Sequence, residues 1–294
     1  MQLRFDHLVK MYGEVTAFDI PTLTIESGEF FTFAGPPSSG KSTVLRVIAG
    51  LEAPSAGTLA VGEHVLSDID PGDRGVVLVA SDGRLDPGSQ PVALFDQPTS
   101  RVDVSQRVSI IEELKHLHAR LGTTFIYTTA DEGEALELSD RIAFLKDGVV
   151  QQVGTPEDVF ERPQNIVVAG FFGDPPMNVV PGILEKDGVA VEIGPRALQL
   201  NGVIAEEYVR DVFLGVRPEH VRLQREPAVG WRGRVTRVDF GDDRTVVEVH
   251  VDGGDFVARE DGESRYEVGD QITIAMAPKH LHIFDASGDR LVVR

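Results

Sequence analysis

The chain has 294 residues, of which 41% are hydrophobic and 26% are charged, so it is long enough for one large or two ordinary domains with a sizeable core. Its 47 Asp and Glu residues outnumber its 28 Lys and Arg residues, and the formal net charge of −19 argues against nucleic-acid binding and against docking on an anionic lipid surface, because both need a basic face. Cysteine is absent, which excludes disulfide bonds and thiolate metal sites and fits a reducing cytoplasm.

The N-terminal segment "MQLRFDHLVK" carries charges throughout and has no apolar core of the kind that signal peptides have. No apolar run in the chain approaches the roughly 18 to 20 residues that a membrane-spanning helix needs. We therefore expect a cytoplasmic protein without direct insertion into lipid.

The first part of the chain alternates short β-rich runs with helical patterns. The runs "EFFTFAG", "GVVLVA", "PVALFD" and "TTFIYTT" are rich in β-branched and aromatic residues, which is typical of strands buried on both faces of a parallel sheet. "GKSTVLRVIAGL" follows the first of these runs and predicts a helix. Another helix begins within "TPEDVFERP", with Thr155 as its cap and Pro156 at its first position.

A longer helix is predicted from Asp103 to Leu121. Asp103 can cap its N-terminus, with Gln106 three residues later as the reciprocal partner. Several apolar residues share one face of this helix, which predicts that the face is buried; they are Val104, Val108, Ile111, Leu114 and Leu121.

The pattern changes at "GDPPMNVVPG", Gly173 to Gly182, where proline and glycine crowd together. We therefore expect two domains, an α/β domain over residues 1–172 and a β-rich domain over residues 173–294. In the second, short alternating runs separated by "DG", "GDD" and "DGG" turns predict two small barrel-like β units.

The segment "GPPSSGKST", Gly35 to Thr43, matches the phosphate-binding loop pattern, and it follows a predicted strand and opens a predicted helix. Its backbone N–H groups would form an anion nest at the positive end of that helix. Lys41 would reach the β- and γ-phosphates, and Ser42 would ligate Mg²⁺. A Gly/Ser turn that caps a helix by chance is the alternative, which the strand-loop-helix context disfavours. The residues expected to bind the nucleotide here are Gly35, Pro36, Ser38, Ser39, Gly40, Lys41, Ser42 and Thr43.

The strand "PVALFD" ends at Asp96, which would supply the second side chain on the Mg²⁺ side of the site. An aspartate at a strand end is often only a cap or a turn residue. Together with the phosphate loop, however, it indicates a Mg²⁺–ATP site in which Ser42 and Asp96 hold the metal.

These segments, together with others along the chain, resemble the ATP-binding subunits of ABC transporters, of the sugar-importer type typified by the maltose and glycerol-phosphate systems. "YGEVTAF" is similar to the family's adenine-stacking loop, with Tyr12 as the aromatic residue. "SRVD" is similar to its D-loop, which implies that Asp103 belongs to the nucleotide site and lies at the dimer interface. "LGVRPEHVRL" and "PKHLHIFD" resemble its C-terminal TOBE-type domain. The resemblance implies an ABC-type P-loop NTPase fold followed by an all-β OB-like/TOBE domain, with ATP and Mg²⁺ as cofactors.

The chain departs from that family at two catalytic positions. Gln97 stands where the family has a glutamate that orients and deprotonates the attacking water. Glutamine can bind a water but cannot accept its proton, and the loss of a general base costs on the order of 10² to 10⁴ in rate. Ala130 stands where the family has a switch histidine, and alanine cannot contact a γ-phosphate.

A third departure lies between Lys41 and Asp96, where the family carries a glutamine loop, a helical subdomain and an "LSGGQ" signature. Here the chain runs almost directly from one strand to the next, so most of the helical subdomain is missing. Ser81 occupies about the place of the loop glutamine, and "DPGSQ", Asp86 to Gln90, is interpreted as a surface loop rather than a signature.

The resemblance also implies partners, because family members sandwich ATP between the phosphate loop of one subunit and the signature of another. Without a signature, this chain cannot build a complete sandwich with itself. We expect the degenerate half of a heterodimer, with a second ABC ATPase subunit and integral membrane permease subunits, peripheral on the inner face of the membrane and very slow in its own turnover. A non-transporting nucleotide-sensing regulator and a decayed gene product are the alternatives.

Three further features have simpler interpretations. His280 and His282 share a face of a predicted strand, where solvated side chains are favoured over a metal pair. Trp231 is interpreted as a packed aromatic residue of the β-rich domain. The acidic run "DEGEALELSD", residues 131–140, is interpreted as a solvated helix face.

Overall fold

A computed structural model describes residues 1–62, 64–66, 69–79, 85, 88–185, 190–193, 196–200, 211–225, 230–241 and 243–292. The chain divides into two compact units, Met1–Arg162 and Pro163–Arg294. The expected domain boundary at residues 172 and 173 stays a prediction. Among the described residues, no helix is both long and apolar enough to cross a membrane.

The first unit is built on an 11-stranded sheet with the strand order β6-β5-β1-β2-β11-β10-β4-β9-β8-β7, in which β3 pairs with β1. The run from β10 through β4, β9 and β8 to β7 is parallel, as the apolar runs of the sequence predict. The strands are β1 (Leu3–Tyr12), β2 (Val15–Ile20), β3 (Leu23–Ile25), β4 (Phe30–Ala34), β5 (Ala56–Val61), β6 (His64–Val65), β7 (Val76–Val79), β8 (Val92–Asp96), β9 (Thr124–Thr129), β10 (Arg141–Lys146) and β11 (Val149–Gly154).

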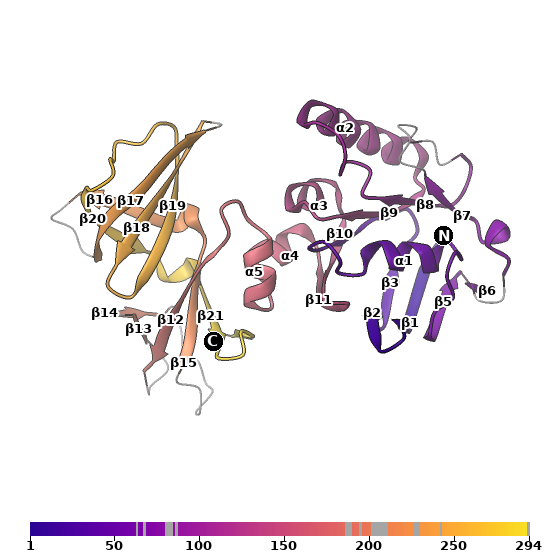
Figure 1. Cartoon of the computed structure of the whole chain (residues 1–294), viewed down its shortest axis with the longest axis horizontal. Coiled ribbons are helices and arrows are strands. Elements are labelled where there is room, and N and C mark those ends of the chain that lie inside the picture. The colour runs from indigo at the N-terminus through magenta and orange to yellow at the C-terminus, as the bar shows by residue number, and fades with distance from the viewer. Residues whose placement is uncertain are drawn as a thin grey trace. The chain divides into compact units, whose positions relative to one another are not determined.

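Helices cover both faces of the parallel strands, and Figure 1 shows α1 on one side of β8 and β9 and α2 on the other. Alternate residues of each strand therefore enter two different cores. The helices of this unit are α1 (Lys41–Ile48), α2 (Val104–Leu121), α3 (Glu132–Leu138) and α4 (Pro156–Glu161), with a 3₁₀ turn at Pro71–Asp73.

Helix α2 has the predicted extent, but its predicted buried face is only partly correct. Ile111 and Leu114 are buried, together with Leu117, against the aromatic residues of β8 and β9. Val104, Val108 and Leu121, by contrast, are 77%, 57% and 39% exposed. Only the middle of the helix is buried against the sheet, so the apolar periodicity extends beyond the contact at both ends.

Strands β7 and β8 are direct parallel neighbours, joined by residues 80–91. Ser81 and Asp86 lie outside the described residues. Gly88 and Ser89 form an exposed turn just before β8. A connection of this length cannot contain a helical subdomain, which agrees with the fold expected from the sequence.

The second unit holds two antiparallel sheets and the short helix α5 (Ile166–Phe171). The sheets enclose one core in which Trp231 is only 6% exposed, so its interpretation as a packed residue is confirmed. The first sheet has the order β14-β13-β12-β15-β21-β22 and the second β16-β20-β17-β18-β19. The strands are β12 (Asn178–Leu184), β13 (Ala190–Ile193), β14 (Arg196–Gln199), β15 (Asp211–Val216), β16 (Val221–Arg225), β17 (Trp231–Gly241), β18 (Arg244–Val251), β19 (Gly254–Asp261), β20 (Gln271–Met276), β21 (Leu281–Asp285) and β22 (Arg290–Leu291).

The two histidines near the C-terminus do not form a solvated pair. His282 in β21 is 8% exposed, and the ring of His280 stacks at 3.6 Å on that of His220 instead. Within the described ranges, no group of three or more His, Cys, Asp or Glu side chains could hold a metal ion.

Candidate functional site

The phosphate-loop segment connects β4 to α1 in a conformation that requires glycine at both ends. Gly35 and Gly40 have φ angles of 153° and 100°. A Cβ at Gly35 would lie 2.0 Å from the carbonyl oxygen of Leu145, and one at Gly40 would lie 2.1 Å from that of Ala17. The loop therefore lies directly against β10 at Gly35 and against β2 at Gly40, and neither position has room for a side chain.

Lys41, the first residue of α1, is only 3% exposed and points back into the loop. Its Nζ atom donates to the carbonyl oxygens of Gly35 and Pro36 at 2.8 and 2.7 Å and to Ser39 Oγ at 3.0 Å. Burial lowers the pKa of Lys41 to about 8, against the opposing effect of the Asp96 carboxylate. The loop thus holds an ammonium group surrounded by oxygens that phosphate oxygens could replace.

Ser42 and Asp96 meet beside this lysine, although they lie 54 positions apart in the sequence. Ser42 Oγ donates to Asp96 Oδ1 at 2.8 Å, and Thr128 Oγ1 donates to the same atom at 2.8 Å. A hydroxyl and a carboxylate are the oxygen donors that Mg²⁺ prefers, usually completed by phosphate and water oxygens. The residues present therefore fit a Mg²⁺–nucleotide complex.

A pocket of about 500 Å³ opens over the loop. Its lining includes residues 15–17 of β2, which belong to the expected adenine-stacking loop, and the turn of Asp147 and Gly148 between β10 and β11, which the sequence did not indicate. The backbone N–H of Asp19 donates to the carbonyl oxygen of Gly148 at 2.7 Å, which fastens these segments to each other. The full lining is Val15, Thr16, Ala17, Ser38, Ser39, Gly40, Lys41, Ser42, Thr43, Gln97, Asp147 and Gly148.

Tyr12, the expected adenine-stacking residue, ends β1 and is not among the residues that line this pocket. Its side chain is 48% exposed, and its hydroxyl donates to the Glu52 carboxylate. That hydrogen bond is the main reason why the pKa of the Tyr12 phenol is raised.

Gln97 follows β8 and lines the pocket, as its alignment with a catalytic position predicts. Its φ angle is 45°, and its backbone N–H donates to Thr128 Oγ1 at 3.1 Å. Its side-chain Nε2 reaches Ser42 Oγ at 3.5 Å, at the limit of a hydrogen bond. The amide thus lies beside Ser42 in the pocket, and a carboxamide can bind a water but cannot take up a proton.

Ala130 directly follows β9, is exposed and does not line the pocket.

Asp103 is also exposed, and it caps α2 by accepting from the backbone N–H of Gln106 at 2.9 Å and from Ser105 Oγ at 2.7 Å. These hydrogen bonds lower the pKa of Asp103. The expected cap by Asp103 is confirmed, but among the described contacts the Gln106 side chain does not return a hydrogen bond to it. A role for Asp103 at a subunit interface stays a prediction.

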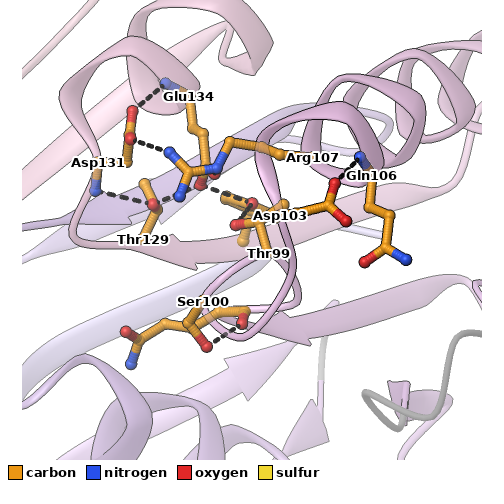
Figure 2. Close-up of polar contacts among 10 residues, drawn as sticks. Thr99, Ser100, Asp103, Gln106, Arg107, Thr129, Asp131 and Glu134 are labelled. Carbon is orange, nitrogen blue, oxygen red and sulfur yellow. Dashed lines mark hydrogen bonds and ion pairs between the residues drawn. The ribbon is translucent and has the colours of Figure 1, made fainter.

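A buried polar network lies between the segments that follow β8 and β9, and sequence reasoning missed it (Figure 2). Arg107 Nη1 of α2 donates to Asp131 Oδ2 at 2.6 Å. Glu134 Oε2 accepts from the hydroxyls of Tyr127 at 2.9 Å and Thr129 at 2.5 Å. Tyr127 in turn lies 3.4 Å from Thr99 Oγ1, so the network spans both segments.

Glu134 shows that the acidic run is not simply a solvated face, because this side chain is 2% exposed. Its Oε1 atom lies 3.6 Å from Arg107 Nε, and each of these two buried atoms has no hydrogen-bond partner. The nearby Glu134 carboxylate adds to burial in raising the pKa of Tyr127. The sequence did contain an indication that Glu134 is buried. It stands one residue before Ala135 and four before Leu138, which places it on the same helix face as these two buried residues.

Three family patterns match the chain. An ABC transporter domain matches residues 18–140, a MalK OB-fold domain matches residues 173–221 and a TOBE domain matches residues 214–284. The three matches cover both compact units and include the phosphate loop, Asp96 and Gln97.

Several curated proteins are similar to the chain over almost its whole length. The trehalose/maltose import ATP-binding protein MalK of Thermococcus litoralis is 32% identical, over 96% of this chain and 97% of that protein. The sn-glycerol-3-phosphate import ATP-binding protein UgpC of Cupriavidus pinatubonensis is 31% identical, over 99% of each. The lactose transport ATP-binding protein LacK of Rhizobium radiobacter is 30% identical, again over 99% of each. The first alignment runs over 364 positions, whereas this chain has 294 residues, so at least 70 aligned positions have no counterpart here.

Proposed function

The chain belongs to the family of ATP-binding subunits of ABC transporters that carry MalK-type OB-fold and TOBE domains, and on that premise we propose that it serves an importer for a sugar, polyol or glycerol-phosphate-like solute. The names of the relatives support the solute class, since they cover maltose and trehalose, lactose and sn-glycerol-3-phosphate. We further propose that it is the degenerate half of a heterodimer.

The nucleotide would be held by the residues of the phosphate loop. Backbone N–H groups at the start of α1 and the Lys41 ammonium would bind the phosphates, and Tyr12 would stack on the adenine. Ser42 and Asp96 would hold Mg²⁺, which when bound neutralises charge on the phosphate oxygens. The 2.8 Å contact between Ser42 Oγ and Asp96 Oδ1 supports this assignment, because it brings both donors to one point beside Lys41.

Hydrolysis by the chain alone is expected to be very slow. Gln97 can orient a water but cannot accept its proton, and no side chain at Ala130 reaches toward a γ-phosphate. The connection between β7 and β8, residues 80–91, is too short for a helical subdomain with a signature segment, so we propose that this chain supplies no signature to a nucleotide bound to a partner. We therefore propose a second ABC ATPase subunit that supplies a signature to this chain's pocket.

The importer assignment also requires integral membrane permease subunits. We propose that the chain is peripheral on the inner face of the membrane and is held there by these proteins rather than by lipid. Its formal charge of −19 supports a protein-mediated contact over attraction to anionic lipid headgroups.

The observation that carries this function is the meeting of Lys41, Ser42, Asp96 and Gln97 at one pocket. The proposed function is tested by two measurements on the purified chain, a calorimetric titration with Mg²⁺–ATP and an assay of phosphate release. We expect saturable binding with almost no turnover. Fast multiple turnover by the chain alone would refute the degenerate site, and absence of binding would refute the nucleotide function.

The transporting role is tested separately by affinity purification from the native membrane in mild detergent. Copurification with an integral membrane subunit and a second ATPase would support the importer. Recovery with partners that have no membrane-spanning segment would favour the alternative, a nucleotide-sensing regulator outside any transporter.

A further inference from the structure

Glu52 lies in the connection between α1 and β5, outside the phosphate loop, and its side chain is 19% exposed. One carboxylate oxygen accepts the hydrogen bond from the Tyr12 hydroxyl and lies 3.3 Å from Lys10 Nζ. The other lies 3.4 Å from Arg46 Nη1. Three groups from β1 and α1 therefore converge on one acidic side chain.

The same connection is fastened to the end of β1 by further contacts. Lys10 Nζ donates to the carbonyl oxygen of Ala53 at 2.8 Å and lies 5.0 Å from the centre of the Tyr12 ring. The backbone N–H of Met11 donates to Ser55 Oγ at 2.9 Å. The Tyr12 side chain is therefore held by the hydrogen bond at its hydroxyl, and the backbone that carries it is held through the neighbouring Met11. Almost half of the surface of Tyr12 stays exposed.

We propose that Glu52 is a positioning residue for the adenine base, because it holds the Tyr12 ring in the orientation that stacks on the nucleotide. The inference rests on the proposed function, in which Tyr12 is the stacking residue. Glu52 acts through Tyr12 and is not expected to touch the nucleotide.

The physical reason is preorganisation. An exposed tyrosine that is free to rotate loses conformational entropy when a base settles on it, whereas a ring that is already hydrogen-bonded loses less. The carboxylate also sits between Lys10 and Arg46, so its negative charge is largely offset close to where an anionic ligand would bind. The Tyr12 hydroxyl and Lys10 both lower the pKa of Glu52, which keeps it ionised at neutral pH.

The test compares calorimetric titrations with Mg²⁺–ATP and with Mg²⁺–tripolyphosphate, which lacks the base. The variants are Tyr12→Phe, which removes only the hydroxyl, Glu52→Ala, the double variant and Glu52→Gln. Glu113→Ala removes an exposed carboxylate from α2, so it controls for the change in charge.

We expect Tyr12→Phe and Glu52→Ala each to weaken ATP binding about three- to tenfold, the effect of losing one solvent-accessible hydrogen bond. The double variant should be no weaker than either, because both changes remove the same contact. Glu52→Gln should restore most of the affinity, since its carboxamide oxygen still accepts from the hydroxyl. Tripolyphosphate binding should be unchanged throughout.

The proposal is overturned if Glu52→Ala leaves ATP binding unchanged, if the two effects simply add, or if tripolyphosphate binding falls in parallel, which would mean that Glu52 only supports the loop. Should Glu52→Ala fail to fold, Tyr12→Phe and Glu52→Gln decide the question alone. Tyr12→Ala separates this inference from the proposed function. If Tyr12→Ala does not weaken ATP binding, adenine stacking itself is wrong; if it does and Tyr12→Phe does not, only the role of Glu52 fails.

Discussion

The two sides of the nucleotide pocket differ in which of the family's functional side chains are present. On the phosphate side, residues 35–43 with Asp96, the lysine, serine and aspartate of the phosphate-loop pattern are all present, and Ser42 contacts Asp96. On the side proposed to act in hydrolysis (the hydrolytic side, residues 97–103 and 129–134), we propose that Gln97 and Ala130 stand in place of a general base and a switch histidine. Yet this side keeps a hydrogen-bonded network in which the buried Glu134 binds Tyr127 and Thr129 and Arg107 binds Asp131.

This comparison indicates that the conformation of the hydrolytic side does not depend on its catalytic side chains. Glu134 and Arg107 fix the backbone between β9 and α3, and neither needs a catalytic group at position 130. A segment can therefore lose its reactive side chain and keep its conformation. The phosphate side has no such freedom, since Lys41 is buried in the loop and is also the proposed phosphate ligand.

The largest effect is expected from Lys41→Ala. Removing the ammonium should weaken Mg²⁺–ATP binding by about 100-fold or more, because a buried, charge-assisted contact is lost. Calorimetric titration measures this directly. Lys115→Ala, on the exposed surface of α2, is the matched control and should bind ATP like the unmodified chain. Equal affinity of the Lys41 variant would mean that the phosphate side binds nothing.

Arg107→Ala tests the hydrolytic side of the pocket. It leaves Asp131 and the buried Glu134 without their cation, so the free energy of unfolding should fall by about 1–3 kcal/mol, less than for a fully buried pair because Arg107 is partly exposed. Urea denaturation of the first unit measures it, with the exposed Arg120→Ala as control. ATP affinity of the folded variant should hardly change. A large loss of affinity would break the separation of the two sides.

Affinity should also depend on pH through Lys41. Because burial lowers the folded pKa of Lys41 to about 8, the chain loses the charge that binds phosphate as pH rises past that value. Mg²⁺–ATP should bind about tenfold more weakly at pH 9 than at pH 7, and binding near pH 8 should take up a proton. Titrations in buffers of different ionisation enthalpy detect that proton. The Lys41→Gln variant should lack both effects.

The same pKa shift affects stability with the opposite sign. The unfolded chain holds the Lys41 proton up to its ordinary value of 10.5, whereas the folded chain releases it near 8. The contribution of this group to the free energy of unfolding should therefore rise between pH 8 and pH 10.5. A contribution from Lys41 that falls over this range, measured as the difference between the chain and Lys41→Gln, would contradict the assignment.

The smallest effect is expected from Gln97→Glu. If a missing base were the only defect, the change would restore on the order of 10² to 10⁴ in rate. We expect a rise of only a few-fold in the purified chain, since no signature segment closes the site. Phosphate release at saturating Mg²⁺–ATP measures it. A full restoration would show that the short connection after β7 does not limit hydrolysis and would remove the reason for a second ATPase subunit.

Local sequence patterns predicted most of the fold of the first unit and the phosphate loop. The runs "EFFTFA", "VALFD" and "TFIYTT" became β4, β8 and β9, and Asp103 and Thr155 became helix caps as expected. These features depend on residues close together in the chain, where backbone preference and periodicity decide the outcome.

Contacts between distant residues could not be read in the same way. No spacing rule places Glu52 at the Tyr12 hydroxyl, brings the turn at Asp147 to the phosphate loop, or selects Arg107 and Tyr127 as the partners of Glu134. The exposed Val104 and Val108 and the buried His282 were misjudged for the same reason. The sequence by itself determined which residues can hold a phosphate and which cannot take a proton, because those are properties of single side chains. Only the tertiary structure decided which of them meet and how they are fixed, because burial and hydrogen bonding depend on the packing of the sheet.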